Sequence, residues 1–127
     1  PDGSIQWHWP VEGEVIKPYS LDGSSINKGI DIRGKAGDPV KSAAEGVVVY
    51  AGGGLRGYGK LVIVKHNDRF LSAYAHNRAV LVEEGDRVKA GQVVARIGAS
   101  GPGTEMLHFE IRKDGKPRNP LEFLPRR

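Results

Sequence analysis

Apolar residues along the chain form short runs separated by glycine, proline, asparagine and aspartate. Two runs rich in β-branched residues, Gly46–Ala51 and Lys60–Lys65, are typical of β-strands. Two further segments, Phe70–His76 and Met106–Arg112, alternate their side chains between two faces, as extended strands do. No segment sustains the 3.6-residue apolar period of an amphipathic helix. The pattern predicts one all-β domain over residues 1–127, a two-sheet β-sandwich or partly closed barrel with very little helix.

Strand alternation also predicts which side chains lie together. On the last predicted strand, an apolar face is formed by Leu107, Phe109 and Ile111. The opposite face is formed by Met106, His108, Glu110 and Arg112. On the earlier strand, the face expected to carry the polar chemistry comprises Phe70, Ser72, Tyr74 and His76. We expect the C-terminal segment Pro120–Leu124 to pack onto the sheet.

Composition narrows the function classes. The chain has 127 residues, a net charge of +4 and no cysteine, so disulfides and thiolate zinc sites are excluded. The basic residues become denser toward the C-terminus, which is compatible with an acidic partner or simply with a solvated surface. No nucleic-acid-binding motif occurs. No apolar run approaches the roughly 18 residues of a membrane span, and the chain begins at Pro1, so we expect any signal peptide or lipid anchor to lie upstream.

Three short polar segments follow one another in a characteristic order: Asn27–Asp31, Tyr74–His76 and Met106–Glu110. They resemble the motifs of the M23 (lysostaphin/LytM) metallopeptidases, which cut peptidoglycan cross-bridges. That family has His-x-Gly-x-Asp, then Tyr-Ala-His, then His-x-His-Phe-Glu. The resemblance extends from about Trp9 to about Leu124 and implies the LytM-type β fold.

The resemblance also implies roles for individual residues. Asp31 and His108 match two zinc-ligand positions, and His76 matches a catalytic position. Asn27 stands where the family has its first ligand histidine, and Met106 where it has a second catalytic histidine. A catalytic zinc needs three protein ligands and an open position, and a neutral amide oxygen is a poor substitute for imidazole. A thioether cannot accept the proton that a catalytic base removes.

These departures predict a degenerate site without zinc and without peptidase activity. In such a site, His76 and Met106 are vestigial catalytic residues. The vestigial zinc ligands are Asn27, Asp31 and His108. Two interpretations of Asp31 and His108 remain open: a mutual hydrogen bond, or residual metal binding. His76 could be a structural residue of a groove or a partner contact.

Within the family, the segments Asn27–Ile32 and Leu71–Asn77 resemble the degenerate LytM domains of the NlpD/EnvC-type murein hydrolase activators. That resemblance implies a partner, a periplasmic N-acetylmuramoyl-L-alanine amidase, which the domain would activate during cell division. It also implies an upstream LysM domain and a lipid anchor to the outer membrane. The expected partner-binding groove comprises Lys28, Asp31, Tyr58, Tyr74, His76, Met106 and Arg112.

Other functions remain open. An active zinc endopeptidase with altered ligands would contain stoichiometric zinc, and a peptidoglycan-binding module would pellet with cell-wall sacculi. The glycine-punctuated stretch from Val82 to Gly98 also resembles swinging-arm carriers, but the chain has neither Met-Lys-Met nor Asp-Lys-Ala around a modifiable lysine.

Overall fold

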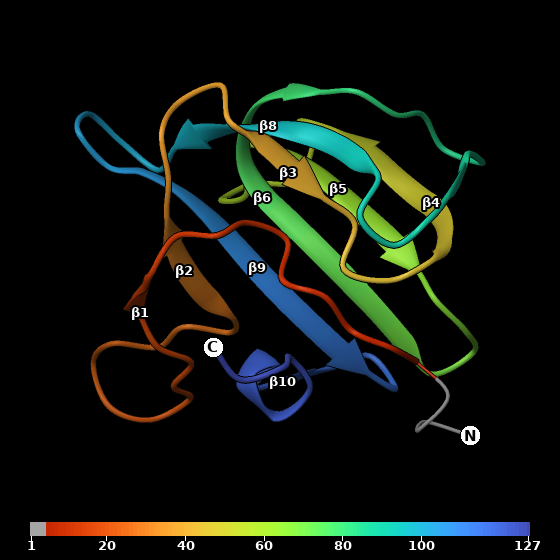
Figure 1. The fold of residues 1–127 in the computed structure, drawn as a ribbon. Coiled ribbons are helices and arrows are strands. Elements are labelled where there is room, and N and C mark those ends of the chain that lie inside the picture. Colours follow the sequence, from red (N-terminus) through yellow and green to blue (C-terminus); the bar gives the residue numbers. More distant parts are fainter. Residues whose placement is uncertain (1–4) are drawn as a thin grey trace.

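The computed structural model describes residues 5–127, so residues 1–4 of the predicted domain lie outside the described part (Figure 1). The described chain forms ten β-strands and one short 3-10 turn, η2 (Pro120–Glu122). The strands are β1 (Val15–Lys17), β2 (Ile30–Arg33), β3 (Pro39–Lys41), β4 (Gly46–Gly52), β5 (Lys60–Lys65), β6 (Phe70–Val80), β7 (Arg87–Val88), β8 (Val93–Ala99), β9 (Glu105–Lys113) and β10 (Lys116–Arg118). The prediction of an all-β fold with very little helix is confirmed. No helix among these residues is long and apolar enough to cross a membrane.

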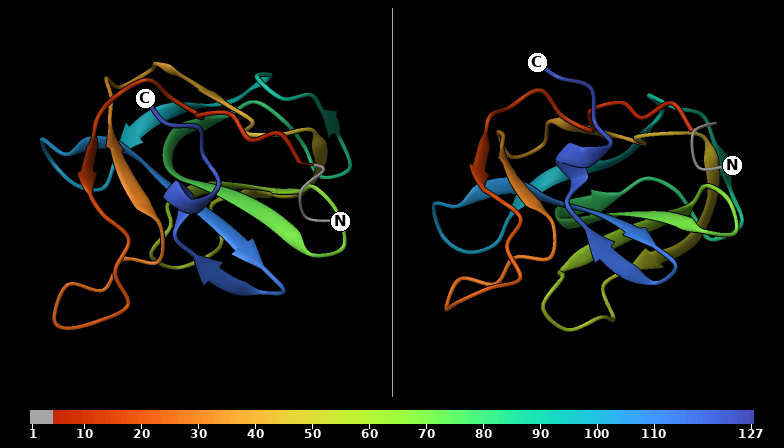
Figure 2. Two further views of the ribbon diagram at one scale, coloured as in Figure 1. Left: turned by 60° about the horizontal axis from the view of Figure 1, so that its bottom comes forward. Right: turned by 90° about the horizontal axis from the view of Figure 1, so that it is seen from below.

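All strand pairs are antiparallel and follow one path, β1-β2-β9-β8-β6-β5-β4-β7, with β10 on β9 and β3 on β8. The path curls round on itself, as the two views in Figure 2 show. The long strands β6 and β9 lie side by side at its centre, with Tyr74 opposite Phe109 and Ala75 opposite His108. Residues opposite each other in a strand pair point to the same face of the sheet. One face of β6 and β9 therefore packs against the core, and the other carries the candidate site.

The core is built from the predicted apolar face of β9. Leu107, Phe109 and Ile111 are completely buried, which confirms that prediction. The segment around η2 also packs on the core: Leu124 is buried and Phe123 lies against Phe70. The packing expected for Pro120–Leu124 is therefore confirmed.

The alternation predicted for Phe70–His76 holds as far as Tyr74 and is wrong at His76. Between Tyr74 and Asn77, β6 advances three residues while β5 advances two, from Val62 to Lys60, which is a β-bulge. His76 lies in this bulge with a left-handed φ of 66°. The bulge turns the His76 side chain to the face that carries His108, while Tyr74 stays in the core.

Candidate functional site

A groove of about 430 Å³ lies over the polar face of β9. Its walls come from three places: the segment that precedes and enters β2, the glycine-rich loop between β4 and β5, and the ends of β6 and β9. Its lining residues are Lys17, Ile26, Asn27, Lys28, Asp31, Gly57, Tyr58, His76, Ser100, Met106, His108 and Glu110. Residues far apart in the sequence therefore meet because β2, β6 and β9 are neighbours in the sheet.

An ion-pair network occupies the floor of the groove, and we call it the His108 network. Asp31 Oδ1 lies 2.7 Å from His108 Nδ1, and Glu110 Oε2 lies 2.8 Å from His108 Nε2. Arg112 Nε donates to the second oxygen of Glu110 at 2.8 Å, and the Tyr58 hydroxyl donates to Oε2 at 3.2 Å. Glu110 is the hub of the network, with its side chain only 1% exposed.

The network fixes the charge of His108. Burial alone would lower the pKa of the imidazole, but the hydrogen bonds and charges of Asp31 and Glu110 outweigh burial and raise the pKa to about 9. The pKa of Glu110 is lowered: burial opposes this, and the bonds and charges of His108 and Arg112 overcome it. At neutral pH the ring is therefore an imidazolium that donates from both nitrogens.

The amide nitrogen of Asn27 has a structural role. Its side chain is buried, and Nδ2 donates to the carbonyl oxygens of Lys17 and Pro18 at 3.4 Å and 3.2 Å. Its backbone also pairs with Ser20 in both directions. The amide nitrogen thus ties the end of β1 and the connection that follows it to the groove wall.

Met106 and His76 border the remaining space. Met106 is 3% exposed, on the same strand face as His108, as predicted. The His76 ring lies edge-on to His108 at 6.1 Å between centroids, and its backbone N–H donates to the Tyr58 carbonyl at 2.8 Å. Burial, followed by the nearby His108 charge, lowers the pKa of His76, so a neutral imidazole faces the groove beside a charged one.

The predicted groove residues divide into three groups. Those that line the groove are Lys28, Asp31, Tyr58, His76 and Met106. Arg112 lies behind Glu110 and reaches the groove only through that carboxylate and Tyr58, 3.5 Å from Nη2. Tyr74 was wrongly placed: its side chain is fully buried, and its hydroxyl accepts from the Ala43 N–H at 2.8 Å. The bulge at His76, invisible to simple alternation, is the reason.

Some site residues were missed. Glu110 shares a strand face with His108 and ends the family motif, so it could have been recognised as the partner of His108 from spacing alone. Lys17, Ile26 and Ser100 also line the groove: Lys17 ends the short strand β1, and the other two come from connections whose path the sequence pattern does not define.

A catalytic zinc ion does not fit these residues. Both nitrogens of His108 are hydrogen-bonded to carboxylates, Asn27 offers only a neutral amide oxygen in place of an imidazole, and Met106 offers a thioether that zinc binds poorly. Among residues 5–127, no three His, Cys, Asp or Glu side chains are grouped so that they could hold a metal ion. Of the two interpretations of Asp31 and His108, the structure favours the mutual hydrogen bond.

The model of peptidase family M23 matches residues 25–120, and the chain belongs to this family. The chain is 54% identical over 121 residues to the murein hydrolase activator NlpD of Escherichia coli, covering 95% of this chain and 32% of that protein. It is 55% identical over 124 residues to the outer membrane antigenic lipoprotein B of Haemophilus influenzae, covering 97% and 30%. The catalytic domain of lysostaphin from Staphylococcus simulans has the same fold, with a TM-score of 0.74, 30% identity and coverage of 87% and 89%.

The chain therefore spans about a third of the length of these two curated relatives. It matches nearly the whole of the lysostaphin catalytic domain, so its strands correspond to the peptidase domain of that protein.

Proposed function

We propose that this domain is a non-catalytic activator of a periplasmic N-acetylmuramoyl-L-alanine amidase and so promotes peptidoglycan hydrolysis during cell division. The observation that carries the proposal is the His108 network at the position of the family's zinc. Its two carboxylates and two cations neutralise one another, and both nitrogens of the retained histidine are engaged. The name of the Escherichia coli relative, murein hydrolase activator, supports the same role.

The groove would then serve as a docking site for the partner. Ile26 is 56% exposed at its rim, and the thioether of Met106 provides an adaptable apolar floor. Lys28 and Tyr58 add a cation and an aromatic ring, types that often anchor interfaces when they become buried. His76 contributes the neutral ring described above. The relative named outer membrane antigenic lipoprotein B supports placing the full-length protein in the periplasm, tethered to the outer membrane.

The experiment measures soluble fragments released from purified sacculi by a cognate amidase, with and without this domain. We expect the domain to accelerate release and to release nothing alone. Lys28→Glu, at an exposed groove position, should reduce the acceleration, whereas Lys89→Glu, an exposed lysine outside the groove, should not. Unchanged amidase rates in the presence of the domain would refute the proposal.

The alternative function, an active zinc peptidase with altered ligands, is favoured by membership of peptidase family M23 and by the likeness to lysostaphin. Metal analysis of the purified domain and a muropeptide cleavage assay with and without a chelator separate the two. Stoichiometric zinc together with chelator-sensitive cleavage by the domain alone would establish the alternative.

A further inference from the structure

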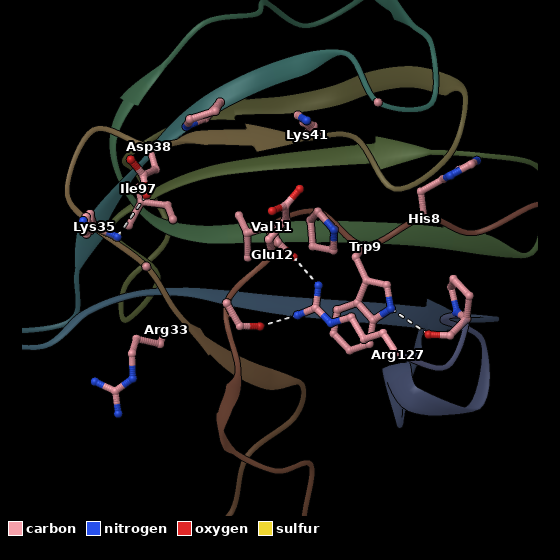
Figure 3. Close-up of a pocket in the computed structure, with 16 residues that line it drawn as sticks. His8, Trp9, Val11, Glu12, Arg33, Lys35, Asp38, Lys41, Ile97 and Arg127 are labelled. Atoms are coloured by element: carbon pink, nitrogen blue, oxygen red, sulfur yellow. Dashed lines mark hydrogen bonds between the residues drawn. The ribbon is translucent and has the colours of Figure 1, made fainter.

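A second and larger cavity, of about 1050 Å³, lies outside the groove and shares no lining residue with it (Figure 3). It is formed by the segment of residues 8–13, the connection from β2 to β3, and the C-terminal residues 125–127. We call it the N-terminal cavity. Its volume is at the upper end of the range of small-molecule binding pockets, so it can accommodate a ligand of several residues.

Hydrogen bonds between the two chain ends hold one wall of this cavity in place. The Trp9 indole N–H donates to the Pro125 carbonyl at 2.7 Å. The Arg127 guanidinium stacks on the Trp9 ring at 3.6 Å and donates to the carbonyls of Val11 and Gly13. Because its one donor is already used, the indole can offer a ligand only apolar surface.

The polar side chains of the cavity carry both signs of charge. Figure 3 shows Asp38 and Lys41 along the upper side and Trp9 with Arg127 along the lower side, with Glu12 between them. Lys35 and Lys41 are exposed and make no side-chain ion pair in the described structure. Glu12 is also exposed, and its charge interacts with that of Arg127 without a close ion pair.

The geometry points to a zwitterionic peptide as the ligand of the N-terminal cavity. The lysine ammonium groups would bind its carboxylates, Glu12 would bind a free amino group, and Trp9 would cover its apolar part. Murein stem peptides combine carboxylates with the amino group of a diamino acid. The inference rests on the proposed function to the extent that murein is the source of such peptides, and it assigns the domain a second murein contact, separate from the amidase groove.

The test uses a purified disaccharide-tripeptide muropeptide as the probe and NMR as the readout. The chain provides three reporters: the indole N–H groups of Trp9, in the cavity, and of Trp7, in the core, and the methyl group of Met106, the only methionine, in the groove. We expect saturable shifts at Trp9 and none at Met106 or Trp7. Acetylating the free amino group of the probe should weaken binding.

Matched variants locate the ligand. Lys41→Ala and Glu12→Gln should each weaken binding about three- to fivefold, the effect of losing one exposed charge contact, and their combination more strongly. Lys116→Ala, an exposed lysine on β10, should leave the affinity unchanged. Shifts at Met106 instead of Trp9, no shift at millimolar probe, or unchanged binding by Lys41→Ala would each overturn the inference.

Failure of this inference and failure of the proposed function are distinguishable. A domain that accelerates the amidase but gives no shift at Trp9 would remove the second murein contact only. A domain that binds the muropeptide at Trp9 but leaves amidase rates unchanged would keep the cavity assignment and remove the activator function.

Discussion

Two histidines on opposite faces of the same sheet have both ring nitrogens hydrogen-bonded, yet their pKa values shift in opposite directions. His108, in the groove, lies between two carboxylates, and its pKa rises to about 9. His66 lies between the Glu45 carbonyl and the Ser72 hydroxyl, both at 2.7 Å, and burial lowers its pKa. The two rings are about equally satisfied, so the charge of the partner rather than the number of bonds decides the charge of the ring.

The contacts of His66 form a chain of dipoles that we call the His66 network. A carbonyl can only accept, so Nδ1 carries the proton and donates to Glu45. Nε2 then accepts from Ser72, whose oxygen lies 2.6 Å from the Tyr74 hydroxyl, and Tyr74 accepts from the Ala43 N–H. The bonds of the His66 network are those of a neutral ring, whereas the bonds of the His108 network are those of a charged ring.

Removal of the Glu110 carboxylate should lower the free energy of unfolding more than any other substitution in the two networks. Glu110→Ala would leave Arg112 and His108 partly buried without their shared counter-charge, and breaking such a pair costs about 3–5 kcal/mol of the free energy of unfolding. Urea denaturation would measure the loss. Glu84→Ala, an exposed carboxylate outside the network, is the control and should change stability by less than about 0.5 kcal/mol. A Glu110→Ala loss close to that of the control would mean that the network does not hold the fold together.

The pH dependence of stability should separate the two histidines. The folded pKa of His108 is raised, so its stabilisation is complete below the unfolded pKa of 6.5 and is lost as pH rises through about 9, amounting to roughly 3 kcal/mol. The folded pKa of His66 is lowered, so its stabilisation is present above 6.5 and is lost as pH falls through the folded value. Stability should therefore decline on both the alkaline and the acid side.

NMR titration of the histidine ring protons tests this assignment directly. The chain has four histidines, and the ring protons of His108 should titrate near pH 9 and those of His66 below 6.5. If both rings titrated near 6.5, the claim that the partner's charge sets the ring's charge would be wrong.

A smaller loss of stability is expected from Ser72→Ala, which interrupts the His66 network at its centre. The substitution leaves His66 Nε2 without its partner, whereas the Tyr74 hydroxyl keeps the Ala43 N–H, and one unsatisfied buried group costs about 1–3 kcal/mol. No charge becomes uncompensated, so the loss should remain below that of Glu110→Ala. Thermal unfolding of the two variants side by side gives the ranking, and a reversed order would show that the dipole chain is the stronger network.

The sequence was sufficient to predict the parts of the fold that depend on regular alternation. The apolar face of β9 and the polar face that carries Met106, His108 and Glu110 follow directly from period two. The same rule put Tyr74 and His76 on one face, whereas the bulge with a left-handed backbone at His76 turns that ring to the groove and leaves Tyr74 in the core. A bulge depends on long-range pairing between β5 and β6, which local pattern does not contain.

The residues of the candidate site that belong to family motifs could be predicted from the sequence. Features that depend on long-range packing could not. Asp31, His76 and His108 were found from the family motifs, and the absence of a metal site, expected from Asn27 and Met106, stays a prediction. The N-terminal cavity could not be predicted, because it forms only when residues 8–13 and 125–127, from opposite ends of the chain, meet over Trp9.

Of the substitutions in the two networks, Tyr58→Phe should lower the free energy of unfolding least, because it removes one neutral donor from the His108 network. Glu110 Oε2 loses the Tyr58 hydroxyl at 3.2 Å but keeps His108, and Oε1 keeps Arg112, so the carboxylate remains satisfied. A single hydrogen bond of this kind contributes about 0.5–1.5 kcal/mol. Tyr50→Phe is the matched variant, since the Tyr50 hydroxyl accepts from an uncharged group, the Gly54 N–H, at 2.9 Å. Bonds to charged groups are the stronger kind, so urea denaturation should show a larger loss for Tyr58→Phe than for Tyr50→Phe. Equal losses would mean that the negative charge of Glu110 is already neutralised by His108 and Arg112, leaving the phenol no more than an ordinary contact.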